Sequence, residues 1–442
     1  MTHTLFAVST SGEPITYRDR KRGWWALSVV YPLLPFTGIA AHAWSGWPGA
    51  LALPLLISYG LLPLLDAFIG EDTNNPAEEV VPQLEADRYY RWLTWGTVPL
   101  HFVALIGCAW WAGTQAMPWW AVAVLAYVAG AGSGLGINTG HELGHKATRI
   151  EQWLARLVLA VPAYGHFTVE HGRGHHRWVA TPHDHASARM GESIYRFALR
   201  EVPGGIRRAW ALEKERLGAR GCCAWSAQNT MLQSYAVTLW LQGALVLAWG
   251  VAMLPFLLIH NLVAWWQLTS ANYVEHYGLL RRELADSTAE SPRSQANVAL
   301  PLCLTPTGGG RLGPASGLSQ ANVALPLCLT PTGGGRLGPA SGRYEPPQPH
   351  HSWNTNHLVT NLVLFHLQRH SDHHAHPSRR YQSLRHFEHL PQLPSGYFGM
   401  FPLAYVPPLW FRVMDPRLLA LPDVQGDLSK VNLDPRLRAA RT

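Results

Sequence analysis

Charged side chains are scarce in this chain, and long stretches contain no cation at all. Only 14% of the 442 residues are charged, whereas 48% are hydrophobic and 20 are tryptophan. Lys and Arg are absent from residues 23–87, 92–145 and 221–280. This balance favours a membrane protein over an ordinary soluble enzyme.

Cysteine is also scarce, and its spacing excludes two kinds of site. The five cysteines are Cys108, Cys222, Cys223, Cys303 and Cys328, and they form no C-x-x-C pair. No disulfide framework and no fused thiolate-bound iron domain is therefore expected. The polar start of the chain has no small-residue cleavage site before the first apolar run, so no cleaved signal peptide is expected either.

Six apolar runs are long enough to cross a bilayer as helices. They cover approximately residues 24–47, 50–70, 92–113, 119–138, 231–250 and 251–271. Basic residues gather outside these runs, at the N-terminus, near 88–91, across 146–220 and after 281. The positive-inside rule then places both chain ends in the cytoplasm. We therefore expect an all-α integral membrane protein with six transmembrane helices and a cytoplasmic, helical, histidine-rich cap.

This interpretation divides the chain into seven sections. They are a cytoplasmic N-terminal segment (1–22), transmembrane helices 1–4 (23–140), a cytoplasmic section with two histidine motifs (141–230), transmembrane helices 5–6 (231–272), a ligand segment (273–286), an insertion (287–342), and a cytoplasmic section with a third histidine motif and the tail (343–442). The insertion contains an exact duplication, because residues 294–317 recur unchanged as residues 319–342. Its Gly- and Pro-rich composition predicts a poorly ordered surface excursion.

The most informative segment of the chain is Leu367–Ala375, which holds three histidines. On a helix, His370 and His374 lie one above the other at i and i+4, and His373 lies beside them. Imidazole is the commonest metal ligand among side chains. This segment therefore predicts part of a metal site.

Two upstream motifs and a separate histidine offer further imidazoles. They are His141 with His145, then His171 with His175 and His176, and finally His276. On an α-helix His171 and His175 share a face, and His176 is turned by about 100° from His175. Adjacent histidines serve two neighbouring ions more easily than one, so the two His-His pairs favour a dimetal site. Nitrogen ligands with open positions suit iron and oxygen activation, although zinc and copper remain open at this point.

Four carboxylates adjoin these histidines: Glu142, Glu170, Glu275 and Asp372. We expect them to accept imidazole N–H groups and fix the ring orientation, with direct coordination as the alternative. His351 lacks the spacing of the clusters and is expected to be solvated or hydrogen-bonded. A competing interpretation is a membrane zinc protease, because His141, Glu142 and His145 match the H-E-x-x-H motif. It leaves the other histidines unexplained, since a mononuclear zinc site needs three protein ligands.

Four stretches of the sequence resemble the membrane alkane 1-monooxygenases, which are relatives of the integral-membrane fatty-acid desaturases and hydroxylases. The stretches are Asn138–Lys146, Glu170–His176, Asn272–Gly278 and Leu367–Ala375, and the likeness extends over residues 20–430. The resemblance implies a multi-pass protein of the bacterial inner membrane with two non-haem irons. It implies nine ligands: His141, His145, His171, His175, His176, His276, His370, His373 and His374.

The resemblance also implies an activity and partners. The family inserts one oxygen atom of O₂ into the terminal methyl of a medium- or long-chain n-alkane, giving the 1-alkanol. Its electrons come from reduced rubredoxin, which an NADH-dependent reductase reduces. No rubredoxin is fused here, so a separate one is expected, attracted by the basic cytoplasmic face.

The insertion distinguishes this chain from the family that it resembles. In family members, the segment that corresponds to Leu280-Arg281 is followed almost directly by the segment that corresponds to Arg343–Glu345. The substrate channel is expected to pass Ser58 and Leu62 on the second span. The small side chain of Ser58 would then admit alkanes longer than about twelve carbons. The alternative role for Ser58 is the packing of helices. The histidine motifs would also fit a lipid desaturase or hydroxylase on the same scaffold. A metal transporter is the non-enzymatic possibility, and it would need ligands at the middle of the membrane.

Overall fold

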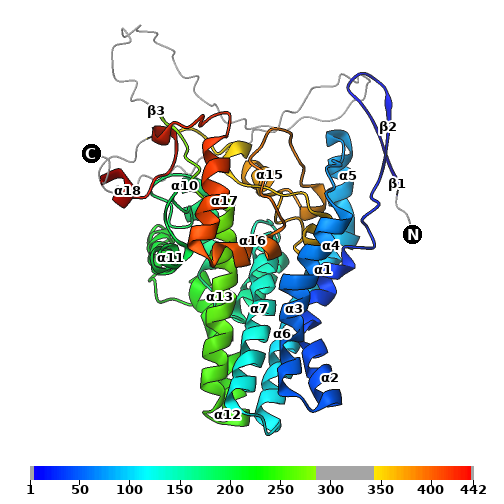
Figure 1. Cartoon of the computed structure of the whole chain (residues 1–442), viewed down its shortest axis with the longest axis vertical. Helices are drawn as coiled ribbons and strands as arrows, with labels where there is room; N and C mark the ends of the chain where they lie inside the picture. The colour runs from blue at the N-terminus through cyan, green and yellow to red at the C-terminus, as the bar shows by residue number, and fades with distance from the viewer. Residues whose placement is uncertain (1–3, 285–342, 440–442) are drawn as a thin grey trace, which may run out of the picture. The chain divides into compact units, whose positions relative to one another are not determined.

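The computed structural model describes residues 4–284 and 343–439 and is mostly helical. The chain separates into two compact units, one formed by Met1–Arg282 with Tyr344–Thr442 and the other by Glu283–Arg343. The predicted insertion at 287–342 lies outside the described residues. The histidine-bearing segments all belong to the first unit, in which long helices lie side by side with shorter helices gathered at one end (Figure 1).

Within the described residues, four helical segments are long and apolar enough to cross a membrane. They are Pro48–Ile69, α6 (Arg88–Thr114), α7 (Trp119–Gly144) and α12 (Thr230–Trp249). Residues Ala26–Leu33 and Pro35–Ser45 meet at 45° and pass the same test as one broken span, which gives up to five. Proline accounts for this break, because Pro32 and Pro35 lack the N–H that would continue the helix.

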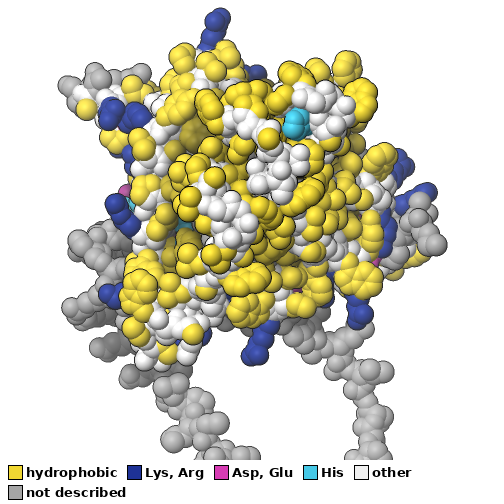
Figure 2. All heavy atoms as spheres, turned by 90° about the horizontal axis from the view of Figure 1, so that it is seen from below, with side chains coloured by type: hydrophobic (Ala, Val, Ile, Leu, Met, Phe, Trp, Pro, Cys, Tyr) yellow, Lys and Arg dark blue, Asp and Glu magenta, His cyan; other side chains and the backbone are white. Residues whose placement is uncertain are grey.

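The expected sixth span is α13 (Met253–His276), a helix of 24 residues that does not reach this hydropathy. Its polar side chains lower the average, since it carries His260, Asn261 and Gln267. The membrane character of the other helices is also visible on their surface. Trp44 is 90% exposed and Leu247 is 89% exposed. Figure 2 shows an end of the helix bundle dominated by hydrophobic side chains, with Lys and Arg at the rim.

Helices α7 and α13 pack closely because α7 presents glycine at their contact. A Cβ atom at Gly130 would lie 2.5 Å from the carbonyl oxygen of His260, and one at Gly134 would lie 2.5 Å from Gln267 Cβ. Small residues of this kind let membrane helices approach each other. The close packing brings together the ends of α7 and α13, which carry His141 and His276.

The cap is attached to the bundle through a buried aspartate. Asp66, at the end of α4 (Leu62–Ile69), accepts hydrogen bonds from the backbone N–H groups of Val359 and Thr360 at 2.9 and 3.1 Å. These groups begin α14 (Leu358–Val363), so Asp66 satisfies N–H groups that have no partner within the helix. The contact holds the segment that leads into α15 (His370–Ala375) against the second span.

The remaining elements complete the description. An unexpected hairpin precedes the first span, with β1 (Thr4–Val8) antiparallel to β2 (Pro14–Arg18). The other helices are α1 (Ala26–Val30), η1 (Tyr31–Leu33), α2 (Pro35–Ser45), η2 (Pro48–Ala52), α3 (Leu53–Leu56), η3 (Ile57–Leu61), η4 (Glu78–Val80), α5 (Val81–Ala86), α8 (Arg149–Ala160), α9 (Phe167–Glu170), η5 (His171–His175), α10 (His176–Trp178), α11 (Ile194–Gly218), η6 (Pro349–His351), η7 (Tyr381–Ser383), α16 (Tyr397–Ala404), α17 (Pro407–Leu419), η8 (Leu428–Lys430) and α18 (Pro435–Ala439), and the short strands are β3 (Glu283–Leu284) and β4 (Arg343–Tyr344).

Candidate metal centre

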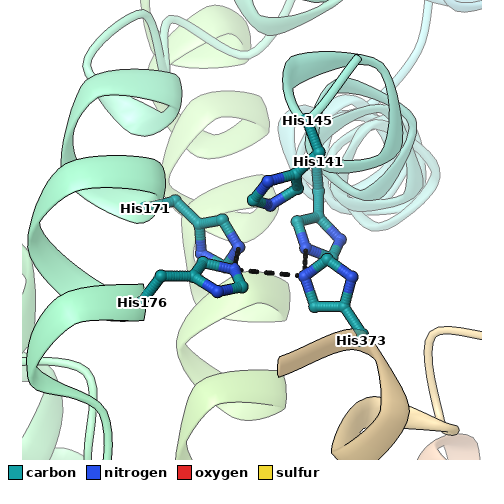
Figure 3. A group of neighbouring side chains, drawn as sticks. All are labelled: His141, His145, His171, His176 and His373. Carbon is teal, nitrogen blue, oxygen red and sulfur yellow. Dashed lines mark hydrogen bonds between the residues drawn. The ribbon is translucent and has the colours of Figure 1, made fainter. Parts of the chain in front are cut away.

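Five histidines from three separate segments form the first candidate ligand group. Their ligand atoms all lie within 4.8 Å of one another, and the group consists of His141, His145, His171, His176 and His373. Figure 3 shows the imidazole rings converging from the end of α7, from the η5–α10 segment and from α15. These segments are far apart in the sequence, so the tertiary structure alone creates the group.

The second motif differs from the α-helical prediction. Residues His171–His175 form a π-helical turn, and the N–H of His176 bonds to the carbonyl of His171. One π turn spans more than four residues, so His171 faces His176, with 3.0 Å between their Nε2 atoms. The rings of His171 and His175 lie side by side as expected, with their centroids 5.1 Å apart, but the ligand nitrogen of His175 belongs to a second group.

Four histidines form this second group: His175, His276, His370 and His374. The α15 helix supplies two of them at i and i+4, with 2.9 Å between the Nε2 atoms of His370 and His374. The end of α13 supplies His276, whose Nε2 lies 3.2 Å from that of His370. Both adjacent pairs, His175-His176 and His373-His374, are divided between the groups, as two neighbouring ions require.

The facing nitrogens have the spacing of ligands around an ion. His373 Nε2 lies 2.8 Å from His141 Nε2 and 3.1 Å from His176 Nε2. An ion bound at about 2.1 Å holds neighbouring nitrogens about 3.0 Å apart in octahedral and about 3.4 Å apart in tetrahedral geometry. The residues therefore fit two metal ions.

Hydrogen bonding alone does not account for this arrangement. Burial lowers the pKa of His373 and of His176 well below the usual histidine range, so the rings are neutral and each has a single N–H. The inward nitrogen of a neutral ring can donate at most one hydrogen bond. When it faces two other inward nitrogens, at least one pair of nitrogens therefore has lone pairs pointing at each other. His145 Nε2 is buried and has no hydrogen-bond partner within the described residues. A cation between the rings satisfies all of these atoms at once.

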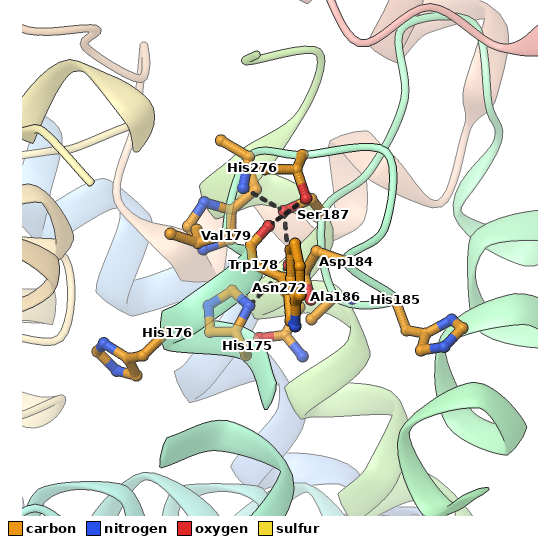
Figure 4. Close-up of polar contacts among 12 residues, drawn as sticks. His175, His176, Trp178, Val179, Asp184, His185, Ala186, Ser187, Asn272 and His276 are labelled. Carbon is orange, nitrogen blue, oxygen red and sulfur yellow. Dashed lines mark hydrogen bonds and ion pairs between the residues drawn. The ribbon is translucent and has the colours of Figure 1, made fainter. Parts of the chain in front are cut away.

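Two of the four outward nitrogens in the second group have oxygen partners, whereas His370 Nδ1 and His374 Nδ1 have no hydrogen-bond partner among the described residues. His175 Nδ1 lies 2.8 Å from Asp184 Oδ2 (Figure 4). His276 Nδ1 lies 3.3 Å from the carbonyl oxygen of His351. Such contacts orient a ring so that Nε2 points to the metal. Sequence reasoning missed Asp184, although its position between His183 and His185 and near the second motif was an available signal.

The four predicted carboxylates have different surroundings. Glu275 Oε2 lies 3.3 Å from His370 Nε2, the nitrogen that faces the metal site. The others pair with cations in the structure. Glu142 contacts Lys146 Nζ at 3.1 Å, Glu170 binds Arg208, and Asp372 binds Arg379 at 2.9 Å.

Glycine enables one of these pairs. A Cβ atom at Gly174 would lie only 2.0 Å from Glu170 Oε2, so no larger residue fits beside the Glu170–Arg208 pair. The Glu170–Arg208 pair therefore packs directly against the π turn that carries His171 and His175.

A third cluster, Glu345 with His350 and His351, lacks the chemistry of a metal site. His351 Nδ1 accepts the N–H of Gln348 at 2.9 Å, so the proton of the neutral ring lies on Nε2. That nitrogen lies 3.3 Å from Glu345 Oε1 without forming a hydrogen bond among the described residues, and because it carries the ring proton it has no lone pair for a metal. His351 is buried and hydrogen-bonded, and its role is to hold η6 and its own carbonyl beside His276.

An apolar cavity of about 50 Å³ adjoins the site. His141, His171 and His370 form one part of its lining, and the remainder includes Leu135, Leu364, Leu367, Phe398 and Phe401. The cavity therefore places a small and mostly apolar space beside the imidazole groups.

The two predicted channel residues lie near this cavity rather than at the metal site. Ser58 is buried, and its Oγ lies 2.7 Å from the hydroxyl of Tyr31, which lines the cavity. Leu62 lines a second, larger cavity of about 1260 Å³ that also contacts Tyr31. Tyr31 therefore separates the two spaces.

Known proteins are similar in sequence to this chain over most of its length. The fatty acid desaturase family matches residues 118–404. The alkane 1-monooxygenase of Pseudomonas putida is 48% identical over 96% of this chain and 91% of its own length. The alkane 1-monooxygenase of Acinetobacter baylyi is 34% identical over 95% of this chain and 90% of its own length.

The name of a more distant relative refers to a different kind of hydrocarbon. The xylene/toluene monooxygenase hydroxylase component of Pseudomonas putida is 23% identical over 62% of this chain and 58% of its own length. The sequence similarity extends over nearly the full length of the chain. The two histidine groups and the apolar cavity beside them are consistent with this similarity. This chain belongs to the alkane 1-monooxygenase family, within the broader fatty acid desaturase family.

Proposed function

We propose that this protein is an alkane 1-monooxygenase that converts medium- and long-chain n-alkanes to 1-alkanols. The observation that carries the proposal is the pair of histidine groups at the wall of an apolar cavity. An alkane offers no hydrogen-bonding group, so it binds by burying CH₂ groups at about 0.8 kcal/mol each. The cavity wall of Leu and Phe supplies that environment and places one end of the chain beside the imidazoles.

The cofactor of the proposal is a pair of non-haem irons. His141, His145, His171, His176 and His373 would hold one ion, and His175, His276, His370 and His374 the other. Bound iron supplies activation of O₂. The protein orients the rings through Asp184 and the His351 carbonyl, and it excludes water from the substrate with apolar side chains.

The electron donor of the proposal is a separate rubredoxin, reduced by an NADH-dependent reductase. The basic sections of the chain would attract an acidic partner. The setting is the bacterial inner membrane, with six spans that include α13 and with both termini and the cap in the cytoplasm. The absence of Lys and Arg from residues 23–87, 92–145 and 221–280 supports this orientation in the membrane.

Metal analysis and product analysis test this function together. Protein purified from membranes is expected to hold two irons per chain and to form 1-octanol or 1-hexadecanol with O₂, rubredoxin, its reductase and NADH. One zinc per chain without iron would instead favour a protease based on His141, Glu142 and His145.

A fatty-acyl desaturase or hydroxylase is the second candidate, because the desaturase family matches residues 118–404. The same preparation should be offered a fatty acyl substrate beside an alkane. Turnover of the acyl chain alone would replace the proposed alkane reaction with this one.

A further inference from the structure

A second small cavity lies beside the metal site, and it is called the polar cavity here because two carboxylates line part of it, although Phe167 and Leu268 also belong to its wall. Its volume is about 20 Å³, which is room for roughly one water molecule. It contacts His171 from the first group and His175 from the second, and two carboxylates, Glu170 and Glu201, form part of its wall. This cavity therefore borders one imidazole of each histidine group and two carboxylates.

The two carboxylates differ in what surrounds their charge. Glu170 is bound at both oxygens by Arg208, with 2.9 Å between Arg208 Nε and Glu170 Oε2. Glu201, on α11, has uncharged hydrogen-bond partners. The hydroxyl of Thr269 donates to Oε2 at 2.6 Å, and the amide of Asn272 donates to Oε1 at 2.8 Å. Glu170 is thus paired with a cation, whereas Glu201 has only uncharged hydrogen-bond partners, and burial raises the pKa of both carboxyls to about 7.

The setting of Glu201 suits proton exchange near neutral pH. Its side chain is buried, and burial raises the pKa of Glu201 to about 7, despite its hydrogen bonds. The titratable and charged groups around it are Tyr164, His166 and Glu170 on the cavity wall, together with Asp184 and Arg200. Arg208, which binds both Glu170 and Asp184, is 15% exposed, so this ion-pair network borders solvent.

The proposed reaction requires protons that the apolar cavity cannot carry. An alkane, O₂, two electrons and two protons give one alkanol and one water. The O–O bond and one C–H bond break, and a C–O bond and new O–H bonds form. The donor supplies the electrons, and solvent supplies the two protons.

We propose that Glu201 relays these protons, through water in the polar cavity, to the side of the site bordered by His171 and His175. The substrate and the protons then reach the metals from different cavities. This inference rests on the proposed function. Glu201 contacts neither substrate nor metal and acts through water.

The variant Glu201→Gln tests the relay, because an amide keeps the size and hydrogen-bonding capacity of the side chain but carries no exchangeable acid proton. We expect two irons per chain, an unchanged KM for octane, and turnover reduced about 10- to 100-fold. The solvent deuterium isotope effect and the peroxide released per NADH should both rise. Glu201→Asp should recover part of the turnover.

A second readout needs no metal and no turnover. In infrared difference spectra of the metal-free protein, Glu201→Gln should remove one component of the carboxylic acid absorption that is lost as pH rises through about 7. Burial also raises the pKa of Glu170 to about 7 and that of Glu275 to about 8, so the components from these two residues should remain. Glu213→Gln is the matched control, because Glu213 is also a buried carboxylate on α11 but hydrogen-bonds to Arg216 and Thr230. It should keep the wild-type isotope effect and peroxide yield.

Several results would overturn the relay. They are wild-type turnover and peroxide yield in Glu201→Gln, carboxylic acid absorption that is identical in wild type and Glu201→Gln, or loss of iron from both Glu201→Gln and Glu201→Asp, which would give Glu201 a purely structural role. Wild-type protein is assayed in parallel. An inactive wild type that holds two irons would count against the proposed alkane reaction, and the infrared band would still decide the protonation of Glu201.

Discussion

Asp184 Oδ2 lies 2.8 Å from His175 Nδ1, in a pair whose side chains are 0% and 2% exposed. The same carboxylate accepts the hydroxyl of Ser187 at 2.6 Å and pairs with Arg208 at 2.9 Å. It is therefore fixed on three sides. Its contact directs His175 Nε2 toward His374 Nε2, 3.3 Å away.

The first prediction concerns this contact. Asp184→Asn removes the charge that holds the imidazole N–H, so metal affinity should fall about 10- to 100-fold. Iron retained during dialysis against graded chelator measures the change. Asp423→Asn, at an exposed position, is the control. Equal iron retention in Asp184→Asn and wild type would contradict the assigned role.

The second prediction uses two adjacent histidines. His373→Ala leaves four imidazoles in the first group, whereas His374→Ala leaves three in the second. We expect His374→Ala to lose more iron, because fewer ligands remain around its ion. Iron per chain after identical purification is the measurement. A greater loss from His373→Ala, or two retained irons in both variants, would argue against the division into two groups.

The third prediction concerns substrate length. Ser58 is buried and hydrogen-bonded to Tyr31, so Ser58→Trp must displace the Tyr31 ring into the space that it lines. The ratio of hexadecane to octane turnover should fall at least about tenfold, which corresponds to about 1.4 kcal/mol. Ser58→Ala should keep the wild-type ratio. An unchanged profile in Ser58→Trp would leave Ser58 as a residue of helix packing.

The fourth prediction concerns pH and the junction between α11 and α12. Burial opposes the charge of Glu213, but hydrogen bonds from Arg216 and Thr230 outweigh burial and lower its pKa from 4.5 to about 2. A depressed acid pKa stabilises the fold above about pH 4.5, and this stability is lost as pH falls toward 2. Glu213→Gln should therefore lower the free energy of unfolding at pH 7 by about 1.5–3 kcal/mol.

Thermal unfolding of wild type and Glu213→Gln in detergent, at several pH values, measures this effect. The difference in Tm should shrink as pH falls through the same window. A difference that is constant with pH would mean that the loss comes from packing. Glu215→Gln, on the same helix, is a control at an exposed position.

The sequence predicted the helices better than their irregularities. Apolar runs located the helices that became α6, α7 and α12. They did not reveal the 45° break before Pro35 or the hairpin β1–β2. Hydrophobicity reports burial averaged over many residues, whereas a break depends on single backbone N–H groups, and a hairpin of ten residues gives little periodic signal.

The polar contacts of the site were less accessible to sequence reasoning. Proximity in the chain suggested that Glu142, Glu170 and Asp372 serve the histidines, but in the fold these carboxylates pair with Lys146, Arg208 and Arg379. A side chain on a helix points away from its immediate neighbour, so adjacency in sequence does not imply contact.

The sequence by itself determined the membrane character of the chain and the histidines that offer nitrogen to a metal, because composition and i, i+4 spacing are local properties. Only the tertiary structure decided how these histidines divide into five and four, since that division depends on the π turn at His171–His175 and on the approach of α7 to α13. It also decided that Asp184 orients His175 and that apolar and polar cavities reach the site separately. Each of these features needs side chains from distant segments, and their distances are set by packing.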